Sequence, residues 1–92
     1  MKLRWTSAAA EDLETIANYL FEKTPAHAAR LIREIYNTPT ILKDFPNSGR
    51  ADKKAGTREL VVGSLPYVLV YQVRGDIVYV VRILHGSQNW PA

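Results

Sequence analysis

The segment Tyr67-Val68-Leu69-Val70-Tyr71-Gln72-Val73 is rich in β-branched and aromatic residues, and so is Ile77-Val78-Tyr79-Val80-Val81-Arg82-Ile83-Leu84. The short stretch Arg74-Gly75-Asp76 joins them. Two such runs connected by glycine and aspartate predict a β-hairpin. We therefore interpret Arg74-Gly75-Asp76 as a turn rather than as an adhesion motif, because glycine and aspartate are common turn residues.

Side chains alternate along a strand, so the two faces of this hairpin can be assigned from the sequence. Neither face is polar, and we expect cover on both, from the chain's own helices and from a partner. Simple alternation places on one face Val68, Val70, Val78, Val80 and Leu84, and on the other Leu69, Tyr71, Val73, Tyr79, Val81 and Ile83.

The chain opens with a predicted strand and a predicted helix. Leu3 and Trp5 alternate with basic residues, as in a short strand. Thr6 or Ser7 then caps a helix whose apolar residues recur at helical spacing. Acidic side chains near the start of a helix favour its positive end. We expect the following to be capping or solvated residues rather than a catalytic pair: Glu11, Asp12 and Glu14.

A second helix should follow directly. Thr24 and Pro25 are a cap and a proline at the first helical position. Pro39 should interrupt this helix, because proline lacks an amide donor and clashes with the preceding turn. The helical segment should end before Pro46.

The last part of the chain predicts three strands in a meander, at residues 58–62, 67–73 and 77–84. The order of elements gives an α+β class, with one two-layer domain over residues 1–92. We expect the N-terminal strand to join a mainly antiparallel four-stranded sheet, with the helical hairpin packed on one face.

Composition excludes several kinds of site. The chain has 92 residues and no cysteine, and its two histidines, His27 and His85, lack metal-ligand spacing. We therefore expect no disulfide, no metal and no cofactor. The N-terminus begins a strand, with neither the apolar core of a signal peptide nor a span of about 20 apolar residues. A cytoplasmic location without membrane contact is the expectation.

A basic loop is the clearest electrostatic feature of a chain whose formal net charge is +3. Arg50, Lys53, Lys54 and Arg58 are opposed only by Asp52. Such a loop is either a solvated linker or a contact for phosphate or for an acidic protein, and the sequence leaves both open.

Several motifs, in this order and spacing, resemble the RelE/ParE superfamily of toxins from type II toxin-antitoxin modules. The resemblance covers nearly the whole chain and implies a small bacterial toxin that is bound by a cognate antitoxin. The residues that carry it are Trp5, Ala10-Glu11-Asp12-Leu13-Glu14-Thr15-Ile16, Tyr19, Phe45-Pro46-Asn47-Ser48-Gly49-Arg50, Gly56-Thr57-Arg58-Glu59-Leu60, Pro66-Tyr67-Val68-Leu69-Val70-Tyr71 and Arg82-Ile83-Leu84-His85-Gly86.

Two activities occur in that superfamily, and the fold does not choose between them. RelE-like members cut mRNA on the ribosome, and their strand motif typically runs Tyr-Arg-Leu-Val-Tyr. Here Val68 stands where the arginine would be, and Gly86-Ser87-Gln88-Asn89-Trp90 carries no charge. Losing one preorganised electrostatic donor commonly costs roughly a hundredfold to a thousandfold in rate. The resemblance is closer to the ParE-like members, which poison DNA gyrase.

The candidate site residues each have a structural alternative. Tyr67 and Tyr71 are core or interface residues, or they stack on bases. Arg82 pairs with a carboxylate or lines an uncovered sheet face. His85 is a general acid or base, or a strand-end hydrogen-bonding residue. A nuclease would use His85, Arg58 and Lys54. Target or antitoxin binding would draw on Arg50, Lys53, Lys54, Arg58, Tyr67, Tyr71, Arg82 and His85.

We therefore expect a ParE-like toxin that inhibits gyrase by binding rather than by catalysis, and that an antitoxin neutralises. Two alternatives remain. One is a ribosome-dependent endoribonuclease acting on mRNA, and the other is a degenerate toxin that only binds its antitoxin.

Overall fold

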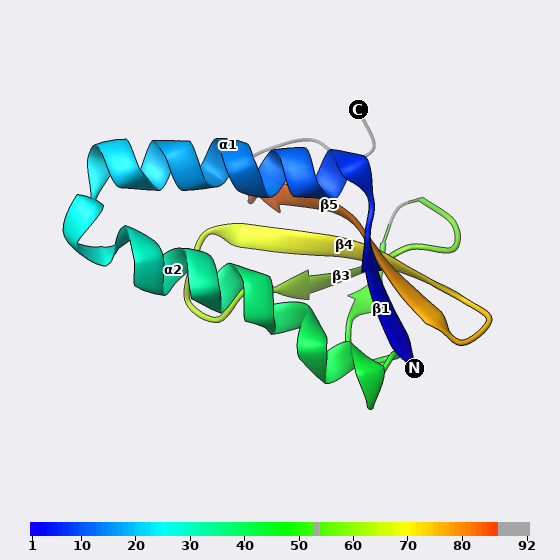
Figure 1. The fold of residues 1–92 in the computed structure, drawn as a ribbon. Coiled ribbons are helices and arrows are strands. Elements are labelled where there is room, and N and C mark those ends of the chain that lie inside the picture. The colour runs from blue at the N-terminus through cyan, green and yellow to red at the C-terminus, as the bar shows by residue number, and fades with distance from the viewer. Residues whose placement is uncertain (53, 87–92) are drawn as a thin grey trace.

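A five-stranded sheet carries two helices on one face (Figure 1). The computed structural model describes residues 1–52 and 54–86. Helix α1 (Ser7–Lys23) and helix α2 (Pro25–Asn37) run antiparallel, and Figure 1 shows both in front of the sheet. The predicted α+β class, with a helical hairpin on a sheet, is confirmed. Within the described residues, no helix is long and apolar enough to span a bilayer.

The strands follow the order β1-β5-β4-β3-β2 across the sheet. β1 is parallel to β5, and the other neighbours are antiparallel. The sheet has one strand more than the four predicted, because the basic loop forms the two-residue strand β2. No apolar alternation marks so short a strand. The five strands are β1 (Lys2–Trp5), β2 (Arg50–Ala51), β3 (Arg58–Val61), β4 (Tyr67–Arg74) and β5 (Ile77–His85).

The helices begin at the predicted cap residues, but only the cap of α1 has its side-chain hydrogen bond, since the Thr24 side chain makes none to α2. The Thr6 hydroxyl accepts a hydrogen bond from the Ala9 N–H at 3.1 Å, and it donates to the Val81 carbonyl at 3.0 Å. Thr6 therefore both begins α1 and ties it to β5. Helix α2 ends just before Pro39, which lies in the 3-10 helix η1 (Thr38–Lys43), as predicted.

The predicted hairpin is confirmed, but part of the face assignment is wrong. Tyr71 pairs with Val80, whereas Val70 pairs with Arg82, so β5 has one extra residue in a β-bulge. Near the two-residue turn, even-numbered residues of β4 pair with odd-numbered residues of β5. Beyond the bulge, even-numbered residues pair with even-numbered ones, as simple alternation assumes. Val78 and Val80 therefore pack in the helix-side core and not beside Val68. The buried core comprises Ala9, Leu20, Ala28, Ile35, Leu42, Val62, Tyr67, Leu69, Tyr71, Val78, Val80 and Ile83.

Tyr71 anchors the loop that leads into β2. Its side chain is 0 % exposed, and its hydroxyl donates to the Pro46 carbonyl at 2.7 Å and accepts from the Gly49 N–H at 2.9 Å. The Arg58 guanidinium donates to the Gly49 carbonyl at 2.8 Å. These contacts leave no room at Gly49, where a Cβ atom would lie 2.6 Å from the Glu59 carbonyl oxygen.

We expect Gly49→Ala to lower the free energy of unfolding by about 2 kcal/mol, because the added methyl group must displace backbone and a buried ring. Urea denaturation of both proteins measures the difference. Gly86→Ala is the matched control, since its nearest neighbour is the Pro66 carbonyl oxygen at 3.6 Å. Equal losses for the two variants would contradict the proposed crowding at Gly49.

Candidate functional site

A cleft lies between the helical hairpin and one end of the sheet. Its volume is about 540 Å³, within the range of ligand pockets. The cleft contains two of the candidate residues, Tyr67 and His85, which pair across β4 and β5. Its described lining is mostly apolar, with no lysine or arginine, and consists of Thr15, Ile16, Tyr19, Leu20, Leu31, Leu65, Pro66, Tyr67 and His85.

Tyr67 is the central polar side chain of this cleft. Its ring meets the His85 ring edge to face, with centroids 5.9 Å apart. Burial raises the pKa of the Tyr67 hydroxyl above its usual 10, and the nearby Tyr19 raises it further. Tyr67 is therefore protonated at neutral pH and can offer a hydrogen bond to a ligand in the cleft.

Arg58 and Tyr71 lie elsewhere and hold the β2 loop through the contacts described above. Arg58 pairs with Tyr71 on β4, whereas His85 pairs with Tyr67. Four residues of strand correspond to about 13 Å at roughly 3.3 Å per residue. The structure therefore does not bring Arg58 and His85 together as a catalytic pair.

Arg82 forms an ion pair with Asp12 of α1. Its Nε and one Nη donate to the two carboxylate oxygens of Asp12 at 2.6 and 3.1 Å. One of these oxygens also accepts the Ile83 N–H at 2.9 Å. The pKa of Arg82 is raised chiefly by the hydrogen bond to Asp12, although burial opposes this shift. We expected Asp12 to be a capping or solvated residue. This expectation is wrong, because the Asp12 carboxylate accepts a hydrogen bond from the Ile83 amide, in the part of β5 that extends past its pairing with β1.

The remaining basic candidates lie at the β2 edge of the sheet. Arg50 bonds the Glu59 carboxylate across β2 and β3, with an Nε to Oε1 distance of 2.6 Å. Lys54 is exposed in the turn that leads back to β3, where its carbonyl accepts the Thr57 N–H. Lys53 lies outside the described residues. The described part of the chain contains no group of three or more histidine, aspartate or glutamate residues arranged to hold a metal ion.

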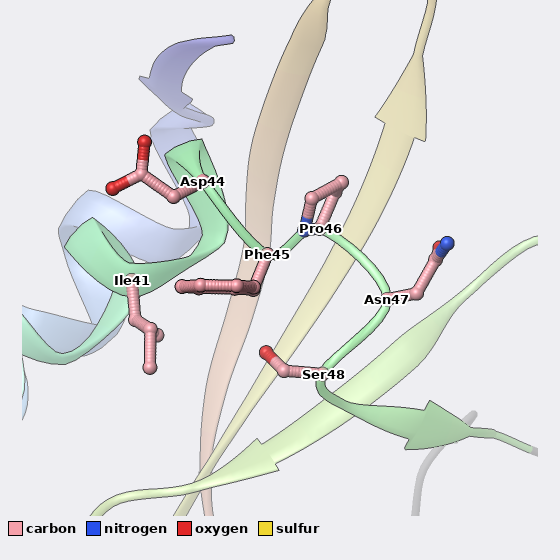
Figure 2. A pocket seen from close by; sticks show the side chains of 6 residues that line it. All are labelled: Ile41, Asp44, Phe45, Pro46, Asn47 and Ser48. Atoms are coloured by element: carbon pink, nitrogen blue, oxygen red, sulfur yellow. The ribbon is translucent and has the colours of Figure 1, made fainter.

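A second pocket, of about 480 Å³, was not predicted from the sequence (Figure 2). It lies at the junction of η1 and the β2 loop, where Ile41 and Phe45 are half or more exposed. In the sequence, their spacing resembles an apolar helical stripe, which predicts burial. The pocket is lined by Ile41, Asp44, Phe45, Pro46, Asn47 and Ser48.

Comparison with known proteins identifies the class of protein to which this fold belongs. Residues 3–90 match the family of the ParE toxin of the type II toxin-antitoxin system parDE. The chain belongs to this toxin family.

Similar proteins carry related names. The putative toxin Y4kP of Sinorhizobium fredii is 34 % identical over 90 residues, which is 98 % of this chain and 93 % of that protein. Toxin RelE2 of Caulobacter vibrioides is 36 % identical over 84 residues, which is 91 % of this chain and 93 % of that protein. A solved structure, the chromosomal ParDE toxin-antitoxin system from P. aeruginosa, matches with a TM-score of 0.87 at 27 % identity, covering 92 % of this chain and 95 % of that one.

We expect Asp12→Ala to destabilise the protein by about 2 to 3 kcal/mol, because it leaves the Arg82 guanidinium and the Ile83 amide without their carboxylate. Asp12→Asn should cost less, since its amide oxygen can still accept from Ile83. Thermal unfolding gives the order. The exposed neighbour Glu11 provides the control, and Glu11→Ala should change stability by no more than about 0.5 kcal/mol.

The raised pKa of Tyr67 predicts a component of alkaline unfolding. The unfolded chain loses this proton near pH 10, before the folded chain does. The contribution of Tyr67 to the free energy of unfolding is therefore fully present below about pH 10. It is lost as the pH rises through the pKa that Tyr67 has in the folded protein. Urea denaturation between about pH 9 and 11 should give a shallower decline for Tyr67→Phe than for the wild type. Tyr36→Phe, at an exposed tyrosine, should follow the wild-type profile.

Proposed function

We propose that this chain is a cytoplasmic toxin that is silenced by a cognate antitoxin and, once released, arrests growth by binding DNA gyrase. Membership of the ParE toxin family and the match to a ParDE system support the toxin-antitoxin pairing. The resemblance at Val68 supports gyrase as the target. The antitoxin should cover apolar surface that the helical hairpin leaves open.

The non-catalytic mechanism is supported by the contacts that three arginines make within the protein. Arg58 holds the Gly49 carbonyl, Arg82 holds Asp12, and Arg50 pairs with Glu59. A ribonuclease needs cationic groups directed at the scissile phosphate, preorganised where its charge develops. These three are engaged with the fold, and the cleft that contains His85 has no described lysine or arginine in its lining. This arrangement favours binding over phosphate cleavage.

The contact between His85 and Tyr67 favours the endoribonuclease as second candidate. A histidine beside a protonated tyrosine, in a cleft of about 540 Å³, can supply a base and an acid for a reaction in which a ribose 2′-hydroxyl attacks the neighbouring phosphate. The similarity to a protein named toxin RelE2 is compatible with this alternative. A degenerate toxin that only binds antitoxin would have neither activity.

Two assays with the purified chain separate these functions. We expect gyrase with plasmid DNA to accumulate cleavage complexes, and message on programmed ribosomes to remain uncut. His85→Ala, which keeps the arginine contacts, should leave the gyrase effect within about threefold of wild type. Cleavage of ribosome-bound message that disappears in His85→Ala would establish the endoribonuclease. Inactivity in both assays, with antitoxin binding retained, would establish the degenerate toxin.

A further inference from the structure

Positive charge collects on the sheet face that the two helices leave uncovered. Leu3 packs against the helix-side core, and side chains alternate along a strand, so Lys2 and Arg4 of β1 point to the opposite face. Both side chains are exposed. Figure 1 shows that the start of β1 lies at the same end of the sheet as the turn between β4 and β5, in agreement with the pairing of Lys2 with Ile77.

The hairpin adds a third exposed cation to this face. Tyr71 is a core residue, so alternation directs Gln72 and Arg74 away from the helices. Tyr79 pairs with Gln72, and Ile77 pairs with Arg74, so all four side chains share the uncovered face. Arg74 is exposed, whereas the other three are half-buried.

The pairing register arranges these side chains in two neighbouring rows that cross β1, β5 and β4. Residues two apart on a strand are separated by about 7 Å, and residues two strands apart by about 10 Å. The cations therefore lie close enough for one extended ligand to contact all three. We call this set the hairpin-end surface, and it consists of Lys2, Arg4, Gln72, Arg74, Ile77 and Tyr79.

The three cations of the hairpin-end surface are not neutralised by the fold, since none of them forms an ion pair with a described carboxylate. The two rows contain no acidic residue. Asp76 is the nearest acidic residue along the hairpin, and it lies in the turn itself. Glu59, in the next row, is already bonded to Arg50. Lys43 and Asp44, which follow each other at the end of η1, add one charge of each sign.

The basic loop that the sequence analysis noted borders this surface. A Cβ atom at Gly56 would lie 3.8 Å from Nε2 of Gln72, so the turn that carries Lys54 reaches the second row. Lys54 is exposed, and Asp52 at the start of the same turn is half-buried. The loop extends the surface, but its charge comes chiefly from the three cations on the strands.

We propose that the hairpin-end surface binds the phosphate backbone of a nucleic acid. Contacts to phosphate commonly come from arginine and lysine together with tyrosine and glutamine, and the two rows combine these four residue types. A duplex carries one negative charge per about 1.7 Å of its axis, so three cations can meet phosphates in any register. An acidic peptide would instead need carboxylates at matching intervals and a pocket for an anchoring side chain. The pockets described above lie elsewhere.

This surface is separate from the Tyr67 cleft. Arg74 lies at the other end of β4, seven residues from Tyr67, which corresponds to about 23 Å at roughly 3.3 Å per residue. Binding here does not depend on gyrase being the target.

The test measures binding of the full-length protein to a labelled twenty-nucleotide DNA strand and to the duplex of the same sequence, by fluorescence anisotropy. DNA lacks the 2′-hydroxyl, so binding is measured apart from any ribonuclease activity. If three phosphates are neutralised, the slope of log K against log salt concentration should be about −2 for the strand and about −2.7 for the duplex. Arg4→Gln/Arg74→Gln, which retains Lys2, should reduce the slope for the strand to about −0.7 and weaken binding about tenfold at about 50 mM salt.

Two control variants separate this surface from net charge and from folding. Arg30→Gln/Arg33→Gln removes the same charge from exposed positions of α2, on the other side of the sheet, and should keep the wild-type slope. Arg4→Lys/Arg74→Lys preserves the charge and should bind within about threefold of the wild type. Thermal unfolding of each variant checks that its fold is intact.

A wild type that binds neither the strand nor the duplex at about 50 mM salt would overturn the proposal. So would equal losses in the two glutamine variants, since the effect would then come from net charge. A twenty-residue polyglutamate that binds as tightly as the DNA, and loses affinity in Arg4→Gln/Arg74→Gln, would assign the surface to an acidic protein instead.

Discussion

The loop that leads into β2 depends for its position on the buried hydroxyl of Tyr71. This hydroxyl joins the central strand β4 to two points of the loop that precedes β2, one as donor and one as acceptor. A buried hydroxyl that loses a partner leaves an unsatisfied polar group, at a cost of about 1 to 3 kcal/mol. The position of the edge strand and the shape of the pocket at the end of η1 therefore depend on this core side chain together with Arg58.

Much of the fold was predictable because its signals are local. The hairpin, the cap at Thr6 and the break before Pro39 each depend on a few neighbouring residues. The faces of the hairpin were harder to predict, because they depend on the register of pairing. A two-residue turn and a bulge at Val81 together moved Val78 and Val80 to the helix side. Strand β2 was missed because two residues without alternation carry no signal of their own.

The candidate site was less predictable, since sequence shows which residues carry charge but not what they contact. Arg58 and Arg82 lie in family-like motifs, and in the structure both bond to the fold. Asp12 was assigned to a helix surface because its partner lies seventy residues away in sequence. Tyr67 and His85, which neighbouring strands bring together, are the pair of predicted site residues that the structure places in one cleft.

The contact of Asp12 with the Ile83 amide also bears on self-association. The long apolar strands β4 and β5 are the segments that would most readily recruit further strands. β4 is internal, and β5 is covered first by β1 and then by α1 through Asp12. The free edges are left to β1, which carries Lys2 and Arg4, to β2, which has two residues, and to the last two residues of β3, which β2 does not reach. Short, charged edges discourage strand-to-strand aggregation. The chain can therefore keep a strongly apolar hairpin without offering its length as a template for fibrils.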